Sequence, residues 1–213
     1  MMKLTPQKLT TLLVLTAALG GGLSACAPMI VGGAMMGSFV ATDRRTTGTQ
    51  VEDEGIELRA ANRIRENLGE RVHINVTSFN RQVLLTGEAP TANDKALVEQ
   101  LVSKVENVRA IVNEIGVAGN ASLSQRTNDT ITTGRVKAGM VDTKDLFANA
   151  FKVVTDRGTV YLMGRVTQRE ANRATDIARS TPGALKVVRV LEFITEEELQ
   201  GMQPKPAPAE VKK

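Results

Sequence analysis

Few side chains in this 213-residue chain have the type and spacing that chemistry requires. The sequence contains one cysteine, Cys26, and one histidine, His73, so it excludes an intrachain disulfide and a site built on several histidines. It shows no nucleophile paired with a base, no metal-ligand spacing and no phosphate-binding loop. We therefore predict no catalytic residue, no metal and no cofactor, and an enzyme is the weakest of the function classes considered below.

Cys26 completes a motif that is typical of bacterial lipoprotein precursors. Lys3 and Lys8 give a basic start, and residues 12–19 form an apolar run too short to cross a bilayer. Leu23-Ser24-Ala25-Cys26 then matches the lipobox, whose small residues suit the peptidase and whose thiol takes the diacylglyceryl group. The alternative is an ordinary secretory signal with a chance cysteine. The motif predicts a signal peptide over residues 1–25 and lipidation at Cys26.

Net charge differs between the two halves of the chain. The whole chain carries 27 Lys and Arg against 23 Asp and Glu, or +4. Residues 54–118 hold 8 basic and 9 acidic side chains, or −1, whereas residues 128–195 hold 11 and 7, or +4. An anionic partner should therefore prefer the second half. With no Trp and one Tyr, the chain offers few stacking platforms for bases, so we predict no nucleic-acid partner.

An internal repeat organises the chain. Val83-Leu84-Leu85-Thr86-Gly87 returns 77 residues later as Val160-Tyr161-Leu162-Met163-Gly164. Each copy follows a polar turn and an alternating apolar run, which together predict a β-hairpin. Each copy also stands between helix-like segments. The repeat predicts an α+β fold of two tandem units, each with the order helix-strand-strand-helix-strand and a small three-stranded sheet packed by two helices.

Apolar spacing places the helices and the core of the first unit. Ile56, Ala60, Ile64 and Leu68 recur as one stripe, which predicts the first helix. A second helix is expected near residues 91–105, and its inward face should consist of Ala96, Leu97, Leu101 and Val105. His73 alternates with apolar neighbours in the first strand and should point to solvent.

The second unit is expected to open with a weak helix over residues 131–141. Asp129 or Thr130 is a suitable N-cap, and two internal glycines lower the helix propensity. Val136 and Met140 can face the core. Ile131 either joins that core or lies exposed beside Arg135. In the exposed arrangement the helix would present an apolar residue and basic residues to a bilayer.

The remaining boundaries follow from composition. A helix over residues 168–179 and a strand over 187–193 complete the second unit. The predicted plan is a signal peptide (1–25), a lipidated Cys and extended tether (26–53), a first domain (54–118), a linker (119–127), a second domain (128–195) and a disordered tail (196–213). The short linker predicts that the two domains touch.

The lipobox followed by two such units resembles the BON-domain family. The order of the lipobox, residues 43–50, the two Val-x-Leu-x-Gly strands and Asn128-Asp129-Thr130 is similar to that of the dual BON-domain outer-membrane lipoproteins associated with division, outer-membrane stress and lipid binding. The resemblance covers about residues 23–194. It implies a non-enzymatic protein, lipid-anchored in the outer membrane and facing the periplasm. Ala27, where an Asp would favour inner-membrane retention, agrees with that location.

The resemblance also implies a partner and a site. It implies binding of anionic phospholipids, phosphatidylglycerol and cardiolipin, through the first helix of the second domain. Carried over by position, the lipid-binding residues are Thr130, Ile131, Gly134, Arg135, Lys137, Ala138 and Val141. Family members place an aromatic residue where Ile131 stands, so lipid contact here is expected to be weaker or carried by other residues. The alternative function is a periplasmic scaffold that holds an envelope-assembly protein, with strand addition at exposed sheet edges.

Overall fold

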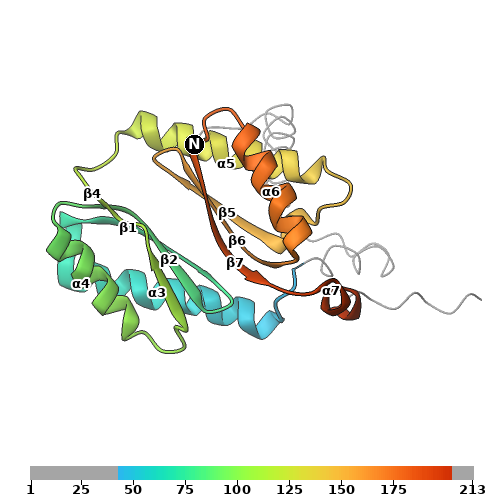
Figure 1. Cartoon of the computed structure of the whole chain (residues 1–213). Coiled ribbons are helices and arrows are strands. Elements are labelled where there is room, and N and C mark those ends of the chain that lie inside the picture. Colours follow the sequence, from blue (N-terminus) through green and yellow to red (C-terminus); the bar gives the residue numbers. More distant parts are fainter. Residues whose placement is uncertain (1–42, 203–213) are drawn as a thin grey trace, which may run out of the picture. The chain divides into compact units, whose positions relative to one another are not determined.

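The computed structural model of the protein describes residues 43–202. The predicted signal peptide, Cys26 and the first part of the tether lie outside the described residues, as do residues 203–213 of the predicted tail. The described residues form two α+β domains, as predicted, and Figure 1 shows them with their helices labelled.

The first domain contains two helices and a mixed sheet. Its elements are α3 (Thr47–Leu68), η2 (Gly69–Arg71), β1 (His73–Phe79), β2 (Gln82–Ala89), α4 (Ala92–Ser103), β3 (Ala110–Asn113) and β4 (Gly116–Val117). The central strand β2 pairs antiparallel with β1 and parallel with both β3 and β4. The predicted stripe on the first helix is buried in the core, together with Val83 and Leu85 of the central strand. The prediction of which α4 residues face the core was partly wrong, because Ala96 is exposed and Val98 is buried instead.

The second domain repeats this plan. Its elements are α5 (Leu123–Val141), η3 (Ala148–Ala150), β5 (Phe151–Asp156), β6 (Thr159–Val166), α6 (Gln168–Ser180) and β7 (Lys186–Phe193). The central strand β6 pairs antiparallel with β5 and parallel with β7. Val136 and Met140 of α5 lie in its core, as predicted, together with Ala171, Ala174 and Ala178 of α6.

One buried aspartate in each domain fixes the hairpin turn. Both turns have two residues with positive φ, Asn80-Arg81 and Arg157-Gly158, as a type I′ turn requires. Asp53 of α3 accepts hydrogen bonds from the backbone N–H groups of Asn80 and Arg81, at 2.8 and 2.7 Å. Asp129 of α5 does the same for the second turn, at 2.9 Å from each N–H. The first helix of each domain is therefore held to the far end of its hairpin.

The two sheets meet through the faces that their helices leave open. Phe79 and Leu84 from the first sheet pack with Tyr161, Met163 and Val190 from the second sheet in one buried cluster. Within the described residues the packing order is thus helices, sheet, sheet, helices, which Figure 1 also shows. This confirms the expectation that the domains touch, and it explains why both faces of each central strand are apolar.

Three predicted boundaries differ from the structure. The segment expected to be an extended tether already contains the start of α3 at Thr47, because Thr46 caps the helix by accepting a hydrogen bond from the N–H of Thr49. Residues expected in the linker form the first turns of α5, capped by Ser122 and Gln125 in a capping box. Residues Glu196–Met202 of the expected tail form helix α7, which buries Leu199.

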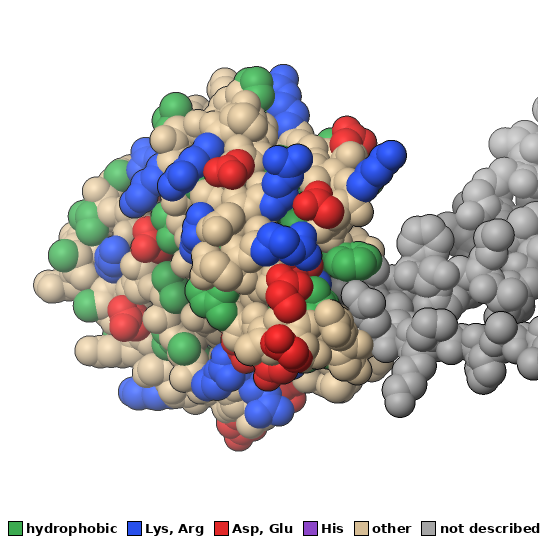
Figure 2. Space-filling view, turned by 45° about the vertical axis from the view of Figure 1, so that its right-hand side comes forward, with side chains coloured by type: hydrophobic (Ala, Val, Ile, Leu, Met, Phe, Trp, Pro, Cys, Tyr) green, Lys and Arg blue, Asp and Glu red, His purple; other side chains and the backbone are tan. Residues whose placement is uncertain are grey.

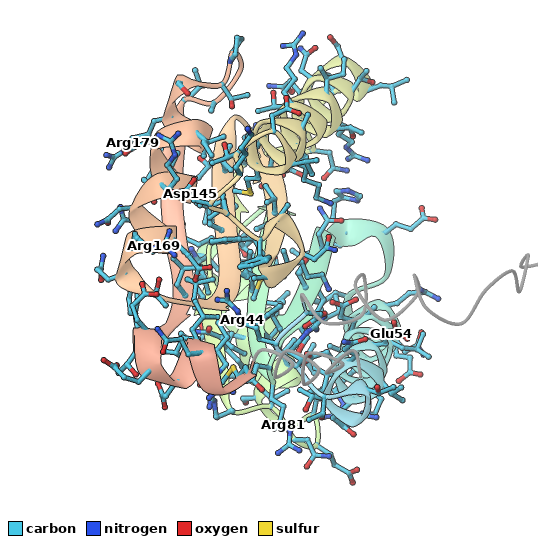
Figure 3. The ribbon with its side chains drawn as sticks, turned by 90° about the vertical axis from the view of Figure 1, so that its right-hand side faces the viewer. Arg44, Glu54, Arg81, Asp145, Arg169 and Arg179 are labelled. Carbon is cyan, nitrogen blue, oxygen red and sulfur yellow. The ribbon has the colours of Figure 1, made fainter. Side chains whose placement is uncertain are left out.

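Arg44 anchors the start of the described chain to the second domain. Its guanidinium makes two hydrogen bonds to the Glu170 carboxylate, at 2.6 and 2.8 Å, and a third to the backbone carbonyl of Arg165. The Arg44 and Glu170 side chains are 5% and 0% exposed. Figure 3 shows Arg44 beside both domains. Arg44 therefore belongs to the folded body and not to the extended tether predicted over residues 26–53.

Candidate functional site in the second domain

Helix α5 places the predicted lipid-binding residues on the surface. All seven of them (Thr130, Ile131, Gly134, Arg135, Lys137, Ala138 and Val141) are exposed. Ile131 is 45% exposed, so of the two alternatives for this residue the exposed one is correct. The opposite stripe of the helix, Asp129, Thr132, Val136 and Met140, is buried.

Neither of the two predicted N-caps, Asp129 and Thr130, caps the helix, because the N-cap is Ser122. The helix begins eight residues earlier than expected, at Leu123, so Asp129 lies in its second turn. Because Asp129 holds the N–H groups of Arg157 and Gly158, the β5–β6 turn lies directly against α5. This contact brings a further arginine to the helix that carries Arg135.

A cavity of about 370 Å³ lies between α5, the β5–β6 turn and the loop between α6 and β7. Two arginines and two exposed apolar residues line it, together with polar and glycine positions, and the principal residues are Asn128, Ile131, Arg135, Arg157, Gly183 and Leu185. Of the seven predicted lipid-binding residues, Ile131 and Arg135 line this cavity, and the other five do not. We call this cavity and its rim the α5 groove.

The loop between α6 and β7 forms one wall of the α5 groove. The N–H of Leu185 donates to the carbonyl of Gly158 at 2.7 Å, and Arg135 donates to the carbonyl of Pro182 at 3.3 Å. The Leu185 side chain packs over Gly158, where a Cβ atom would collide with it, yet Leu185 remains 85% exposed. A leucine that exposed, held beside two guanidinium groups, is suited to contact an apolar surface.

Sequence reasoning missed Arg157 and Leu185. Arg157 was assigned only to the polar turn, and Leu185 falls in a loop between two predicted elements. For Arg157, the available signal was the repeat. Asp53 and Asp129 are 76 residues apart and so occupy equivalent positions, which means that the second hairpin turn should lie against its helix as the first one does. Nothing in the sequence indicated that Leu185 would be exposed.

The charge distribution favours an anionic partner on this side of the protein. Arg135 and Lys137 are exposed on α5, and Arg173 and Arg179 are exposed on α6. Figure 3 shows Arg169 and Arg179 projecting from α6, and Figure 2 shows Lys and Arg side chains spread over the upper part of its view. Arg169 is less available than its position suggests, because it pairs with Asp145 at 3.6 Å and with Glu196 at 3.4 Å.

Neither a metal centre nor a transmembrane helix is found in the described part of the chain. Among the helices of residues 43–202, none combines the length and the hydropathy needed to cross a bilayer. Over the same residues, no three His, Cys, Asp or Glu side chains are grouped so that they could hold a metal ion. What the α5 groove offers chemically is paired guanidinium groups for a phosphate or carboxylate, next to apolar side chains.

Comparison with known proteins identifies the class of this chain. The BON domain model matches twice, over residues 53–119 and 128–195, which together exceed half of the chain. The chain therefore belongs to the BON-domain family, as its repeat and lipobox indicated.

Individual relatives narrow this class. The chain is 36% identical over 196 residues to outer membrane lipoprotein DolP of Haemophilus influenzae, with 91% of this chain and 100% of the relative covered. It is 33% identical over 154 residues to a 21 kDa hemolysin of Actinobacillus pleuropneumoniae, with 71% of this chain and 79% of the relative covered. The chain is thus a DolP-like outer-membrane lipoprotein with two BON domains, and this relationship implies no catalytic activity.

Comparison with solved structures gives only a weak match. CdsD, a structural protein of the type III secretion system of Chlamydia trachomatis, matches with 13% identity and a TM-score of 0.28, covering 75% of this chain and 99% of that one. A TM-score that low gives no information about function.

Proposed function

We propose that this protein binds anionic phospholipids through the α5 groove and thereby helps to maintain the outer membrane. The observation that carries the proposal is that Arg135 and Arg157 line the same cavity as the exposed side chains of Ile131 and Leu185. Guanidinium groups pair with phosphate oxygens, while the two apolar side chains can enter the region between headgroups and acyl chains. Phosphatidylglycerol and cardiolipin are the expected lipids, and the excess of basic residues in the second domain supports an anionic surface.

The mode of binding follows from the size of the groove. A cavity of about 370 Å³ can take a headgroup but not whole acyl chains. The protein would therefore rest on the leaflet with the exposed side of α5 and Leu185 toward the lipid. Each Lys or Arg close to an anionic surface contributes about 1 kcal/mol, so Arg135, Arg157 and Lys137 together supply a weak, salt-sensitive attraction.

Vesicle co-sedimentation tests this proposal. The chain from residue 26 onward, carrying Cys26→Ser so that it stays unacylated, should sediment with phosphatidylglycerol vesicles and far less with neutral phosphatidylcholine vesicles. The double variant Ile131→Glu, Arg135→Glu should lose that binding. A matched control on the first domain is Leu58→Glu with Arg63→Glu, which changes an exposed Leu and an Arg of α3. Equal binding to both kinds of vesicle, or full binding by the α5 variant, would contradict the proposal.

Location within the cell is a separate part of the proposal. The family resemblance implies that the protein gathers at the division site. A fluorescent fusion of the acylated protein should be enriched at midcell in dividing cells, and the Ile131→Glu, Arg135→Glu variant should lose that enrichment while staying in the outer membrane. An even distribution of the wild-type fusion would remove division from the proposed function without affecting lipid binding.

A further inference from the structure

A second cavity of about 370 Å³ lies on the other flank of α5, where the two domains meet. Its polar lining comes from both domains: His73 and Glu88 from β1 and β2, Arg126, Asp129 and Thr133 from α5, and Asp156 from β5. We call it the junction cavity. It shares Asp129 with the α5 groove, but its other lining residues are different.

Glu88 is the unusual residue of the junction cavity. Its side chain is 1% exposed, and neither carboxylate oxygen accepts a hydrogen bond from any group in residues 43–202. The cation that pairs with it is Arg157, whose Nε lies 3.8 Å from Oε1, beyond hydrogen-bond distance. A buried carboxylate is strongly unfavourable unless donors surround it, and Glu88 lacks such donors.

The fold itself does not require an acid at this position. The repeat relates Glu88 to Arg165 by the 77-residue shift, and the second domain forms the same strand with a partly exposed basic residue there. The neighbouring glycines, Gly87 and Gly164, are equivalent: Gly87 lets the backbone of His73 at the start of β1 approach closely, and Gly164 does the same for Ala150, the residue before β5. The acid at residue 88 is therefore a feature of the junction cavity rather than of the domain.

A second carboxyl group stands next to Glu88. One oxygen of Asp156 accepts a hydrogen bond from the N–H of Gly87, the residue before Glu88, at 3.1 Å. Burial raises the pKa of Asp156, and the negative charges of Glu88 and Asp129 raise it further, against the opposing hydrogen bond from Gly87. The two carboxyl groups thus lie close together, and Arg157 is the cation near both of them.

The charge count of the junction cavity leaves one negative charge over. Glu88, Asp129 and Asp156 contribute three carboxyl groups, against the two guanidinium groups of Arg126 and Arg157. Both oxygens of Asp129 are already used by the N–H groups of the β5–β6 turn. The acceptors that remain belong to Glu88 and Asp156, so a ligand that brings one positive charge and several N–H donors would satisfy them.

We propose that the junction cavity binds a primary ammonium group, which donates hydrogen bonds to the carboxylates of Glu88 and Asp156. An –NH₃⁺ group carries three donors on a compact cation, whereas a quaternary ammonium has no N–H to donate. Two sources present this group: a free alkylamine, and the ethanolamine headgroup of a phospholipid. In the second case Arg126, whose buried Nε has no hydrogen-bond partner in the described part of the chain, would face the lipid phosphate.

Titration with ethanolamine, followed by residue-resolved NMR, tests the proposal on the unacylated chain from residue 26 onward. Ethanolamine should give saturable shifts at Glu88, Asp156 and His73, and choline, its quaternary analogue, should not. Glu88→Gln keeps the shape of the side chain and removes its charge, so ethanolamine should bind about tenfold more weakly or worse. Glu54→Gln, on the exposed side of α3, is the matched control and should bind as the wild type does.

A second titration distinguishes the two possible sources of the ammonium group, a phospholipid and a free amine. If the ligand is a lipid, water-soluble dihexanoyl phosphatidylethanolamine should bind more tightly than ethanolamine and should also shift Arg126. If the ligand is a free amine, the two should bind alike and Arg126 should not respond. Asp156→Asn provides an independent variant should Glu88→Gln fold poorly. Failure of ethanolamine to saturate any of these signals, or unchanged binding in folded Glu88→Gln, would overturn the proposal.

Discussion

At the scale of single residues, the buried aspartates show how much one side chain can organise. Asp53 lies in α3 and accepts the hydrogen bonds that hold the first hairpin turn. Its carboxylate also accepts hydrogen bonds from the Ser78 hydroxyl at 2.7 Å and from the Arg45 guanidinium at 2.8 Å. Burial pushes the pKa of Asp53 upward, but the hydrogen bonds from Arg81, Ser78, Arg45 and Asn80 outweigh burial and hold the pKa below its ordinary value. The buried carboxylate is thus charged, and both of its oxygens accept hydrogen bonds.

Removing either aspartate should destabilise its domain. Asp129→Ala leaves the N–H groups of Arg157 and Gly158 without their acceptor, which should lower the free energy of unfolding by about 1–3 kcal/mol. Because the same bonds place Arg157 in the α5 groove, vesicle binding should also weaken. Urea denaturation and vesicle co-sedimentation measure the two effects. Asp53→Ala is the control: it should lower stability but leave lipid binding by the folded protein intact.

Ile131 gives a residue-scale prediction that should affect binding alone. Ile131→Trp places an interfacial aromatic side chain at an exposed position, so it should raise the affinity for phosphatidylglycerol vesicles. Ile131→Ser should lower the affinity. Both variants should change unfolding free energy by no more than about 0.5 kcal/mol, because the site is exposed. Identical binding of the Trp and Ser variants would mean that Ile131 does not meet the lipid.

At the scale of elements, the sequence predicted the strands and helices better than their ends. The Val-x-Leu-x-Gly repeat located β2 and β6 because these strands are central and apolar on both faces. The start of α5 was missed because residues 124–128 are polar and lie before an apparent N-cap at Asp129 or Thr130, whereas Ser122 and Gln125 supply the actual cap. The exposed turns of a helix leave no apolar stripe, so only capping chemistry marks them.

Helix α5 contains two glycines whose replacement should have different effects. At Gly134 an added Cβ would meet nothing within 4 Å, so Gly134→Ala should stabilise the protein by about 0.5–1 kcal/mol through helix propensity. At Gly139 the Cβ would approach the Ile177 side chain to 2.9 Å, so Gly139→Ala should gain little or lose stability. Thermal denaturation of the two variants side by side checks this. A gain at Gly139 equal to that at Gly134 would show that α6 can move away from α5.

At the scale of the whole molecule, the two domains are joined by packing and by ion pairs. Glu192 of β7 accepts hydrogen bonds from Asn80 at 2.6 Å and from Arg109 at 3.1 Å, and Lys152 of β5 pairs with Glu57 of α3 at 2.7 Å. The sequence predicted that the domains touch but not how, because the apolar residues on the second face of β2 and β6 could equally have faced a partner. Which surfaces meet depends on both sheets at once, and no local pattern records it.

The Arg44–Glu170 pair yields a stability prediction at this scale. Arg44→Ala leaves the Glu170 carboxylate buried without its cation, which should lower the free energy of unfolding by about 3 kcal/mol. Arg59→Ala is the control, because the Arg59 and Glu52 side chains are 42% and 27% exposed and their pair should contribute less than about 1 kcal/mol. Differential scanning calorimetry measures both. Similar small losses in the two variants would show that Arg44 does not hold the chain to the second domain.

The same pair sets an acid sensitivity. Burial raises the pKa of Glu170, but hydrogen bonds from Arg44 and from the Thr167 N–H more than offset burial and leave the pKa below its ordinary 4.5. A carboxyl group whose pKa is lower in the folded state stabilises the fold above its unfolded pKa, and that contribution disappears as the pH falls through the folded value. Urea unfolding between pH 7 and pH 3 should therefore show a steep loss below about pH 4.5 in the wild type. Glu170→Gln should be less stable at pH 7 and should lose less on acidification.

Because Arg44 is bound to the second domain, the segment that connects the predicted acylation site to the folded domains ends at residue 44. From Cys26, the predicted acylation site, to Arg44 there are 18 residues (44 − 26), which cannot reach farther than about 65 Å even when fully extended. The lipid binding proposed for the α5 groove would then take place at an effective concentration on the order of millimolar or higher. An affinity too weak to recruit a free protein would then be enough to keep this one on the leaflet, so the proposed binding does not require an aromatic residue where Ile131 stands.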